Sequence, residues 1–433
     1  MQAVMAFENA PPFAAPLRFF LTAPLFGVLA GLLVVLEGPD LFASRWMGGT
    51  LAATHLITIG FMLQVMLGAM IQIMPVVAGA NLRQPLQVAR VVHVGLSAGG
   101  LLLAGGFYFG WPVGLSVAAT VLCLTVLIFL GASLDALRGV PSTSPTIRGL
   151  KLALVGLFGV VGLGGAMALA LANGWAWSLP ALVDLHVGWG LGGWAGILLA
   201  AMAYVVVPMF QLTPGYPARP SWWFPVIMLV LLLLWSGAVV VDQQWLVRLC
   251  QFFAALAGIA FAVLTLRLQQ KRRRARPDAT YRYWQLGLVV SIFALFLQLT
   301  VAIWPPAADL PGWTLFFGIA LVTGGFLPFI IGMLYKIVPF LGWLHLQECG
   351  KARVPAPPMN KLLPDSDAQR QFKAYAVSLL LLLLAVLLPS WLARAAGLGF
   401  ALANGWLWWN LLGAFRRYRQ AAVVIEEKLA ARA

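Results

Sequence analysis

The chain has few of the charged residues that a water-soluble protein carries on its surface. Of its 433 residues, 9% are charged and 62% are hydrophobic, and the mean hydropathy is +0.92. A soluble globular fold is excluded because such a composition cannot cover a protein surface with polar groups. The apolar stretches are long enough to cross a bilayer. The sequence therefore predicts a multi-pass membrane protein whose first partner is the lipid bilayer.

Cysteine is nearly absent. Cys123, Cys250 and Cys349 are scattered along the chain. This spacing excludes a CxxCH heme attachment site, a zinc knuckle and a disulfide framework. Any heme would therefore be bound non-covalently.

Acidic residues are also scarce where they would be needed to move protons. No Asp or Glu lies deep within an apolar stretch, and Asp184 comes nearest, two residues before His186. Proton pumping is therefore unsupported, because proton relays across membranes are built from such groups.

The apolar stretches predict twelve helical spans. They cover residues 17–37, 49–79, 88–110, 112–137, 148–173, 180–211, 221–241, 244–269, 281–304, 311–345, 373–393 and 397–415. We therefore expect an all-α integral membrane protein.

A short pattern of two small residues and a proline occurs three times, on spans two, six and ten. The copies are Gly60, Gly68 and Pro75, then Gly193, Ala201 and Pro208, then Gly324, Gly332 and Pro339. Such self-similarity predicts a threefold repeat of four helices, with units 1–143, 144–277 and 278–433. The third unit includes a cytoplasmic loop at 346–372. Small residues at helical spacing let the three central helices approach closely.

The distribution of positive charge predicts the orientation. Of the 28 Lys and Arg residues, 24 fall in the even-numbered loops and the two termini. The positive-inside rule then places both termini in the cytoplasm, and we expect a bacterial inner membrane location. The basic run 271–276 sits between two spans, where topology and anionic lipid headgroups explain it. We therefore expect no nucleic-acid partner. The basic stretch after Arg416 is expected to lie along the inner leaflet.

All four histidines lie in or beside a span. His55 and His186 enter spans two and six near the outer surface, whereas His93 and His345 lie near the cytoplasmic ends of spans three and ten. Neutral imidazole is a good ligand for heme iron and copper, and polar groups at membrane depth are functional candidates. We treat all four as candidate metal ligands, with packing as the alternative for each.

Helical geometry predicts that the two outer histidines face different spaces. His186 lies seven residues before Gly193, but His55 lies only five before Gly60. At about 100° per residue, this offset turns them to different faces of equivalent helices. We therefore expect one pocket for each histidine, or one working pocket.

A methionine stripe follows His55. Met62, Met66, Met70 and Met74 recur every four residues on span two. Thioethers suit Cu(I), so the stripe is compatible with copper binding, although flexible core packing explains it as well. Copper is a weaker expectation than heme.

Together, these features resemble subunit I of the heme-copper oxidase superfamily. The resemblance rests on twelve spans in three arcs, both termini inside, and the span-two segment THLITIGFMLQVMLGAMIQIMPVVAG. The chain is also similar to the NnrS group, heme- and copper-containing membrane proteins of the nitric oxide response. The resemblance implies that His55 corresponds to a heme ligand and His186 to a copper ligand.

The departures from that family are specific. Span seven has no histidine for copper, span ten has none for heme, and Gly190 replaces the tyrosine that follows the copper ligand in many oxidases. A binuclear oxygen-reducing centre is therefore excluded, while one b-type heme can remain. By resemblance, the outer arginines, among them Arg248 and Arg394, would pair with heme propionates. Snorkelling anchors are the alternative.

The sequence thus predicts a heme-binding membrane protein in respiratory electron transfer or in the response to nitric oxide and other diatomic gases. No catalytic residue follows from the pattern, and enzyme and sensor both stay open.

Two other functional classes also stay open. One is a twelve-span transporter, with copper as one cargo and a polar path along Lys336, Tyr335, Tyr204, Gln72 and Gln64. The other is a cofactor-free assembly or interaction subunit of a respiratory complex.

Overall fold

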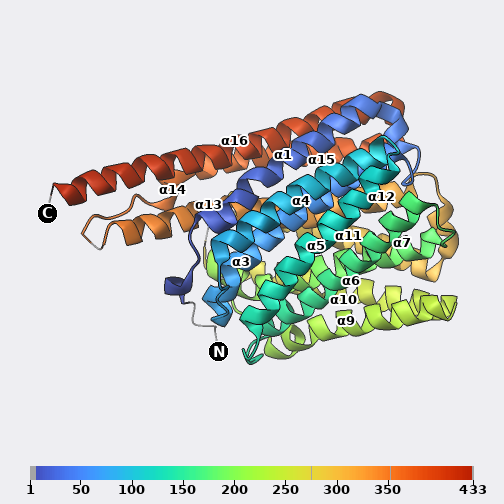
Figure 1. The fold of residues 1–433 in the computed structure, drawn as a ribbon, viewed down its shortest axis with the longest axis horizontal. Helices are drawn as coiled ribbons and strands as arrows, with labels where there is room; N and C mark the ends of the chain where they lie inside the picture. The colour runs from blue at the N-terminus through green and yellow to red at the C-terminus, as the bar shows by residue number, and fades with distance from the viewer. Residues whose placement is uncertain (1–5, 275, 352, 432–433) are drawn as a thin grey trace.

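The computed structural model describes residues 6–274, 276–351 and 353–431, and these parts of the chain are almost entirely helical. Long helices run side by side in one bundle (Figure 1). The uninterrupted ones are α1 (Ala14–Glu37), α4 (Pro85–Tyr108), α5 (Pro112–Leu137), α6 (Pro145–Asn173), α9 (Ala218–Val240), α10 (Gln244–Gln270), α11 (Ala279–Ile303), α15 (Asp365–Leu387) and α16 (Pro389–Ala430). The short ones are η1 (Phe7–Asn9), η2 (Gly38–Phe42), η5 (Pro305–Asp309) and α14 (Met359–Leu362).

Three further long helices, on spans two, six and ten, each contain a wider π-helical segment. The first is α2 (Gly48–His55), η3 (Leu56–Leu63) and α3 (Gln64–Ala78). The second is α7 (Leu179–Val187), η4 (Gly188–Gly196) and α8 (Ile197–Gln211). The third is α12 (Trp313–Ile319), η6 (Ala320–Phe326) and α13 (Leu327–Cys349). The π segments begin 19, 20 and 19 residues before Pro75, Pro208 and Pro339.

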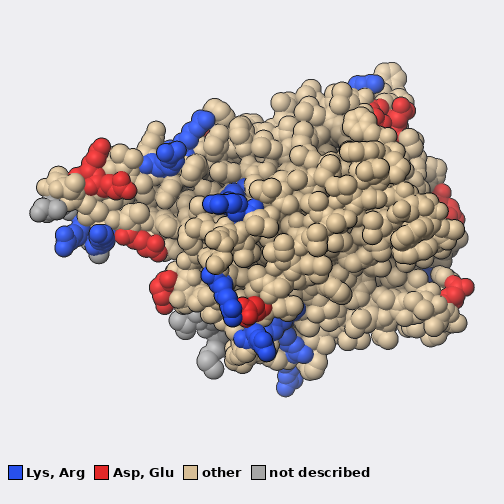
Figure 2. All heavy atoms as spheres, viewed as in Figure 1, with Lys and Arg blue, Asp and Glu red and all other residues tan. Residues whose placement is uncertain are grey.

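The membrane-spanning character predicted from the sequence is confirmed for most of these helices. Among the described residues, eleven helices are long and apolar enough to cross a membrane. Helix α16 is continuous over 42 residues but is not one of the eleven. The apolar sequence of α16 is interrupted by Asn404 and Asn410, and basic residues follow from Arg416 onward. The face in Figure 2 shows a broad band almost free of charge, with Lys and Arg gathered mainly toward the end that holds both termini.

The C-terminal stretch does not lie flat against the bundle. Helix α16 projects beyond the bundle as a straight continuation of its membrane part (Figure 1). On this projection, Ile425 is buried against Leu346 of α13 and Leu362 of α14. The prediction that the residues after Arg416 lie along the inner leaflet is therefore wrong, because their apolar side chains pack on the end of α13. The expected loop 346–372 contains α14 and the beginning of α15.

The small residues of the recurring sequence pattern pack each interrupted helix closely against a neighbouring helix. A Cβ atom at Gly60 would lie 2.1 Å from Phe26 on α1, and one on α6 at Gly156 would lie 2.2 Å from the Gly193 backbone. A Cβ atom at Gly332 would lie 2.7 Å from Tyr283 on α11. Close approach is thus confirmed, but its partners are α1, α6 and α11. The three interrupted helices are not drawn together by these residues.

The lysine within span ten is paired, and its partner is Asp278 at the start of α11. Lys336 Nζ lies 2.9 Å from Asp278 Oδ2, which also accepts a hydrogen bond from Arg274 at 2.9 Å. Asp278 Oδ1 accepts from the Tyr281 backbone N–H and so caps α11. The Lys336 and Asp278 side chains are only 19% and 11% exposed. This pair fixes α13 to the N-terminus of α11.

We expect Asp278→Ala to lower the free energy of unfolding by about 3 kcal/mol, because it removes a helix cap and leaves Lys336 unpaired in a mostly buried position. Thermal unfolding of the detergent-purified protein measures the effect. Asp40→Ala, at an exposed position without a side-chain hydrogen bond among the described residues, is the control. An equal loss in the two variants would contradict this role.

Candidate functional site

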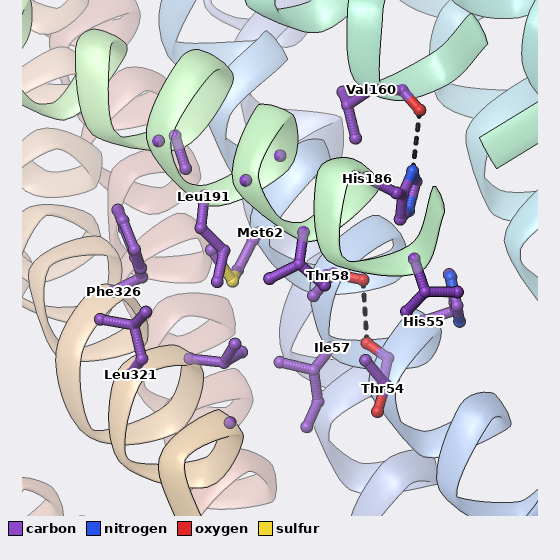
Figure 3. Close-up of a pocket in the computed structure, with 18 of the residues that line it drawn as sticks. Thr54, His55, Ile57, Thr58, Met62, Val160, His186, Leu191, Leu321 and Phe326 are labelled. Atoms are coloured by element: carbon purple, nitrogen blue, oxygen red, sulfur yellow. Dashed lines mark hydrogen bonds between the residues drawn. The ribbon is translucent and has the colours of Figure 1, made fainter. Parts of the chain in front are cut away.

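A cavity of about 1030 Å³ occupies the centre of the bundle. All three π-helical segments line it, and most of its wall is apolar. Representative lining residues are Thr58 and Met62 of η3, Leu191 of η4, and Leu321 and Phe326 of η6 (Figure 3). The cavity lies at the upper end of the range for small-molecule sites. Thr54 and Val187, which also line it, are exposed although they lie on central helices.

His55 and His186 both line this cavity, each near the start of a π-helical segment. His55 is the last residue of α2, and its Nδ1 lies 2.8 Å from the Leu51 carbonyl oxygen one turn earlier. His186 lies on α7, and its Nδ1 lies 3.0 Å from the Val160 carbonyl oxygen on α6. A carbonyl oxygen only accepts hydrogen bonds, so Nδ1 of each imidazole is the protonated nitrogen that donates.

The other ring nitrogen of each histidine is therefore the one with a free lone pair. Among the described residues, neither Nε2 has a hydrogen-bond partner. Each Nε2 atom also keeps some accessible surface. Both residues also line the cavity. Donation from Nδ1 to a carbonyl is the arrangement by which proteins fix the tautomer and orientation of a metal-binding histidine.

The two imidazoles lie next to each other. Their ring centroids are 6.4 Å apart and their planes differ by 30°. Figure 3 shows them together at one edge of the cavity. The prediction that His55 and His186 face different spaces is wrong. It took Gly60 and Gly193 as equivalent reference points, but Gly60 lies against Phe26 of α1, whereas Gly193 lies against Leu232 of α9 and Gly156 of α6.

A glycine makes room for the His186 ring. A Cβ atom at Gly164 on α6 would lie 2.7 Å from Cε1 of His186. Two residues earlier on the same helix, Gly162 has no neighbouring atom within 4 Å of such a Cβ atom. Only a glycine at 164 therefore leaves the imidazole in place.

The cationic residue of the cavity is Arg45, in the segment before α2. Arg45 lines the cavity and forms an ion pair of 3.0 Å with Asp184, two residues before His186. The guanidinium also stacks over the Trp46 ring, 4.8 Å from its centroid. These contacts hold together the two segments that carry the histidines.

The two arginines predicted as propionate partners do not line the cavity. Arg248 is exposed and donates to the Gln244 carbonyl of its own helix at 3.4 Å. Arg394 is exposed and lies beside Gly38. Arg45 replaces them at this site, and its position ten residues before His55 was the signal in the sequence.

The inner histidines do not join the outer pair. His93 shares a hydrogen bond of 2.9 Å with Thr22, through Nε2. His345 accepts a hydrogen bond from the Phe13 backbone N–H at 3.1 Å, also through Nε2. Neither lines the cavity. Both connect neighbouring segments of the bundle and keep no free Nε2.

Only part of the methionine stripe lines the cavity. Met62 and Met66 line the cavity, whereas Met70 and Met74 are fully buried in the apolar core. The residues proposed for a polar path are also dispersed. Gln64, for example, donates to Ser97, and none of the five lines the cavity.

Sequence reasoning missed two amides on the far wall of the cavity. Gln251 of α10 and Gln298 of α11 line it, and Gln298 Nε2 lies 3.5 Å from Gln251 Oε1. Polar residues in the apolar spans eight and nine were the available signal.

In the described part of the chain, no group of three or more His, Cys, Asp or Glu residues is arranged to hold a metal ion. The two imidazoles are therefore the candidate donor set. Comparison with protein-family models gives no match for the chain, and no curated protein matches it.

We expect His55 and His186 to be neutral Nδ1–H tautomers at pH 7, because each Nδ1 donates to a carbonyl. Nitrogen-15 NMR of histidine-labelled protein measures this directly, since the chain has only four histidines. Single His→Gln variants assign the signals. A protonated Nε2 in either neutral ring would contradict the geometry.

Proposed function

We propose that this chain is a membrane protein that holds one b-type heme between His55 and His186 and serves electron transfer. The observation that carries the proposal is that both histidines line one cavity and that, in the described chain, neither Nε2 has a hydrogen-bond partner. Two neutral imidazoles are a suitable axial pair for heme iron.

The spacing of the pair supports a shared metal ion. A bond from a metal ion to an imidazole nitrogen is about 2 Å long. The rings are stacked with their centroids 6.4 Å apart, so one ion can reach a nitrogen of each imidazole once the rings turn toward it. Copper accepts imidazole as well, but an ion alone would fill only a small part of a cavity of about 1030 Å³.

The cavity fits the remainder of a heme in chemical character. Its wall is mainly apolar, as a porphyrin requires, while Arg45 at its rim can pair with a carboxylate. When bound, the heme would supply one-electron chemistry. The residues of this chain would hold it, set its orientation through the two Nδ1–H bonds and limit access of water.

The larger architecture supports the same proposal. We infer three repeats of four helices, because the π-helical segments and the glycine contacts recur at matching places in each unit. Such an arrangement resembles the heme-copper oxidase core without its binuclear centre. The distribution of Lys and Arg supports an inner-membrane orientation with both termini in the cytoplasm.

Electron transfer is favoured over gas binding because the two histidines would occupy both axial positions of the iron. Binding of nitric oxide or carbon monoxide would require one imidazole to leave. With both histidines bound to the iron, the protein would transfer electrons in the respiratory membrane, with other respiratory subunits as partners.

The first test is the absorption spectrum of purified protein, oxidised and reduced, with a pyridine hemochrome assay and copper analysis. We expect about one heme per chain and loss of the Soret band in His55→Ala and in His186→Ala. His93→Ala is the matched control and should keep the spectrum, since His93 lies outside the cavity. A colourless, metal-free wild-type protein made with sufficient heme supply would overturn the proposal.

A second test uses the glycine beside His186. We expect Gly164→Val to reduce heme content at least tenfold, because its side chain would occupy the place of the imidazole. Gly162→Val adds the same side chain where no atom lies within 4 Å and should retain heme. Equal heme content in the two variants would show that the His186 position does not matter.

A further inference from the structure

The part of the cavity wall formed by α10 and α11 carries a second polar site. Gln251 lies seven residues into α10, and Gln298 lies five residues before the end of α11. His55 and His186 each lie seven residues from the start of their helices. At 1.5 Å per residue, these positions lie about 7 to 10 Å along their helices from the ends on one side of the bundle. The amides therefore share the depth of the histidines.

The two amides engage each other only in part. The one contact between them joins Gln298 Nε2 to Gln251 Oε1 at 3.5 Å, the outer limit for a hydrogen bond. Each amide has one carbonyl and one NH₂ group, so any such pairing leaves one carbonyl and one NH₂ group without a partner. Among the described residues neither remaining group is bonded, and neither is sealed from open space, while both residues line the cavity.

The wall beyond the amide pair is apolar. Ala254 and Gly258 of α10 and Leu295 of α11 line the cavity toward its floor. Ser291, two turns from Gln298 on α11, adds a hydroxyl with no hydrogen-bond partner in the described chain. The wall thus has a polar end that offers one donor and one acceptor and an apolar stretch below it.

Charge restricts what this wall can bind. The charged residues that line the cavity are Arg45 and Asp184, which pair at 3.0 Å beside the segment that carries His186. No cation faces the amide pair from the described helices that line the cavity. A carboxylate bound there would lose its hydration without gaining an opposite charge, which is costly in an apolar setting.

We propose that Gln251 and Gln298 bind the head group of an uncharged lipophilic molecule that both donates and accepts hydrogen bonds, such as a primary amide or an alcohol with an alkyl chain. The head group accepts from the free NH₂ group and donates to the free carbonyl. Its chain lies along Ala254, Gly258 and Leu295. This site is separate from the heme ligands and does not depend on the heme.

The test compares two nearly isosteric probes, decanamide and decanoate, in saturation binding to the protein in lipid nanodiscs, with empty nanodiscs subtracted. We expect one saturable site for decanamide and at least tenfold weaker binding of decanoate. In Gln251→Leu/Gln298→Leu, decanamide should bind at least tenfold more weakly. Gln285→Leu is the matched control on α11, because Gln285 lies outside the cavity and donates to Tyr281.

Equal affinity for the two probes, or unchanged affinity in the double variant, would overturn the proposal, as would the absence of saturable decanamide binding. The comparison of the two probes needs only wild-type protein, so it does not depend on the folding of a variant. Decanamide should bind the colourless His55→Ala variant as tightly as wild type. Loss of heme and loss of this site are therefore separate results.

Discussion

Glycine-mediated packing of three interrupted helices against their neighbours creates the central cavity. Gly60 lies against Phe26, Gly193 against Gly156 and Gly332 against Tyr283, with no room for a side chain at these contacts. Each interrupted helix is thereby held closely against one neighbouring helix. In lipid, where apolar burial adds little between helices, such close packing is a main source of helix association.

The π-helical segments determine what faces that open centre. A π turn widens the helix and changes the direction of every later side chain relative to an α-helix. Segments η3 and η4 follow His55 and His186 almost directly, and both imidazoles end up at the same edge of the cavity. Carbonyl oxygens of Leu51 and Val160 then hold each Nδ1. Local backbone geometry and two hydrogen bonds thus produce a pair of free Nε2 atoms.

The spans were predictable from the sequence, and the details of the site were not. Apolar length sets where helices form in a membrane, so most predicted boundaries lie within a few residues of the helices. The direction of His55 was mispredicted because Gly60 and Gly193 were taken as equivalent reference points, although they pack on different neighbours. Arg45 was passed over as a ligand-pairing residue because its contact with Asp184 joins positions 139 residues apart. The course of α16 beyond Arg416 was missed because burial of Ile425 depends on α13 and α14.

The central claim is that His55 and His186 bind the same iron ion. Electron paramagnetic resonance of the oxidised, purified protein tests it most directly, since the spin state of ferric heme reports its axial ligands. The account predicts a low-spin signal typical of two imidazole ligands, which becomes high-spin when either histidine is replaced by alanine. A high-spin signal in the wild-type protein, or a low-spin signal that survives replacement of His186, would contradict it.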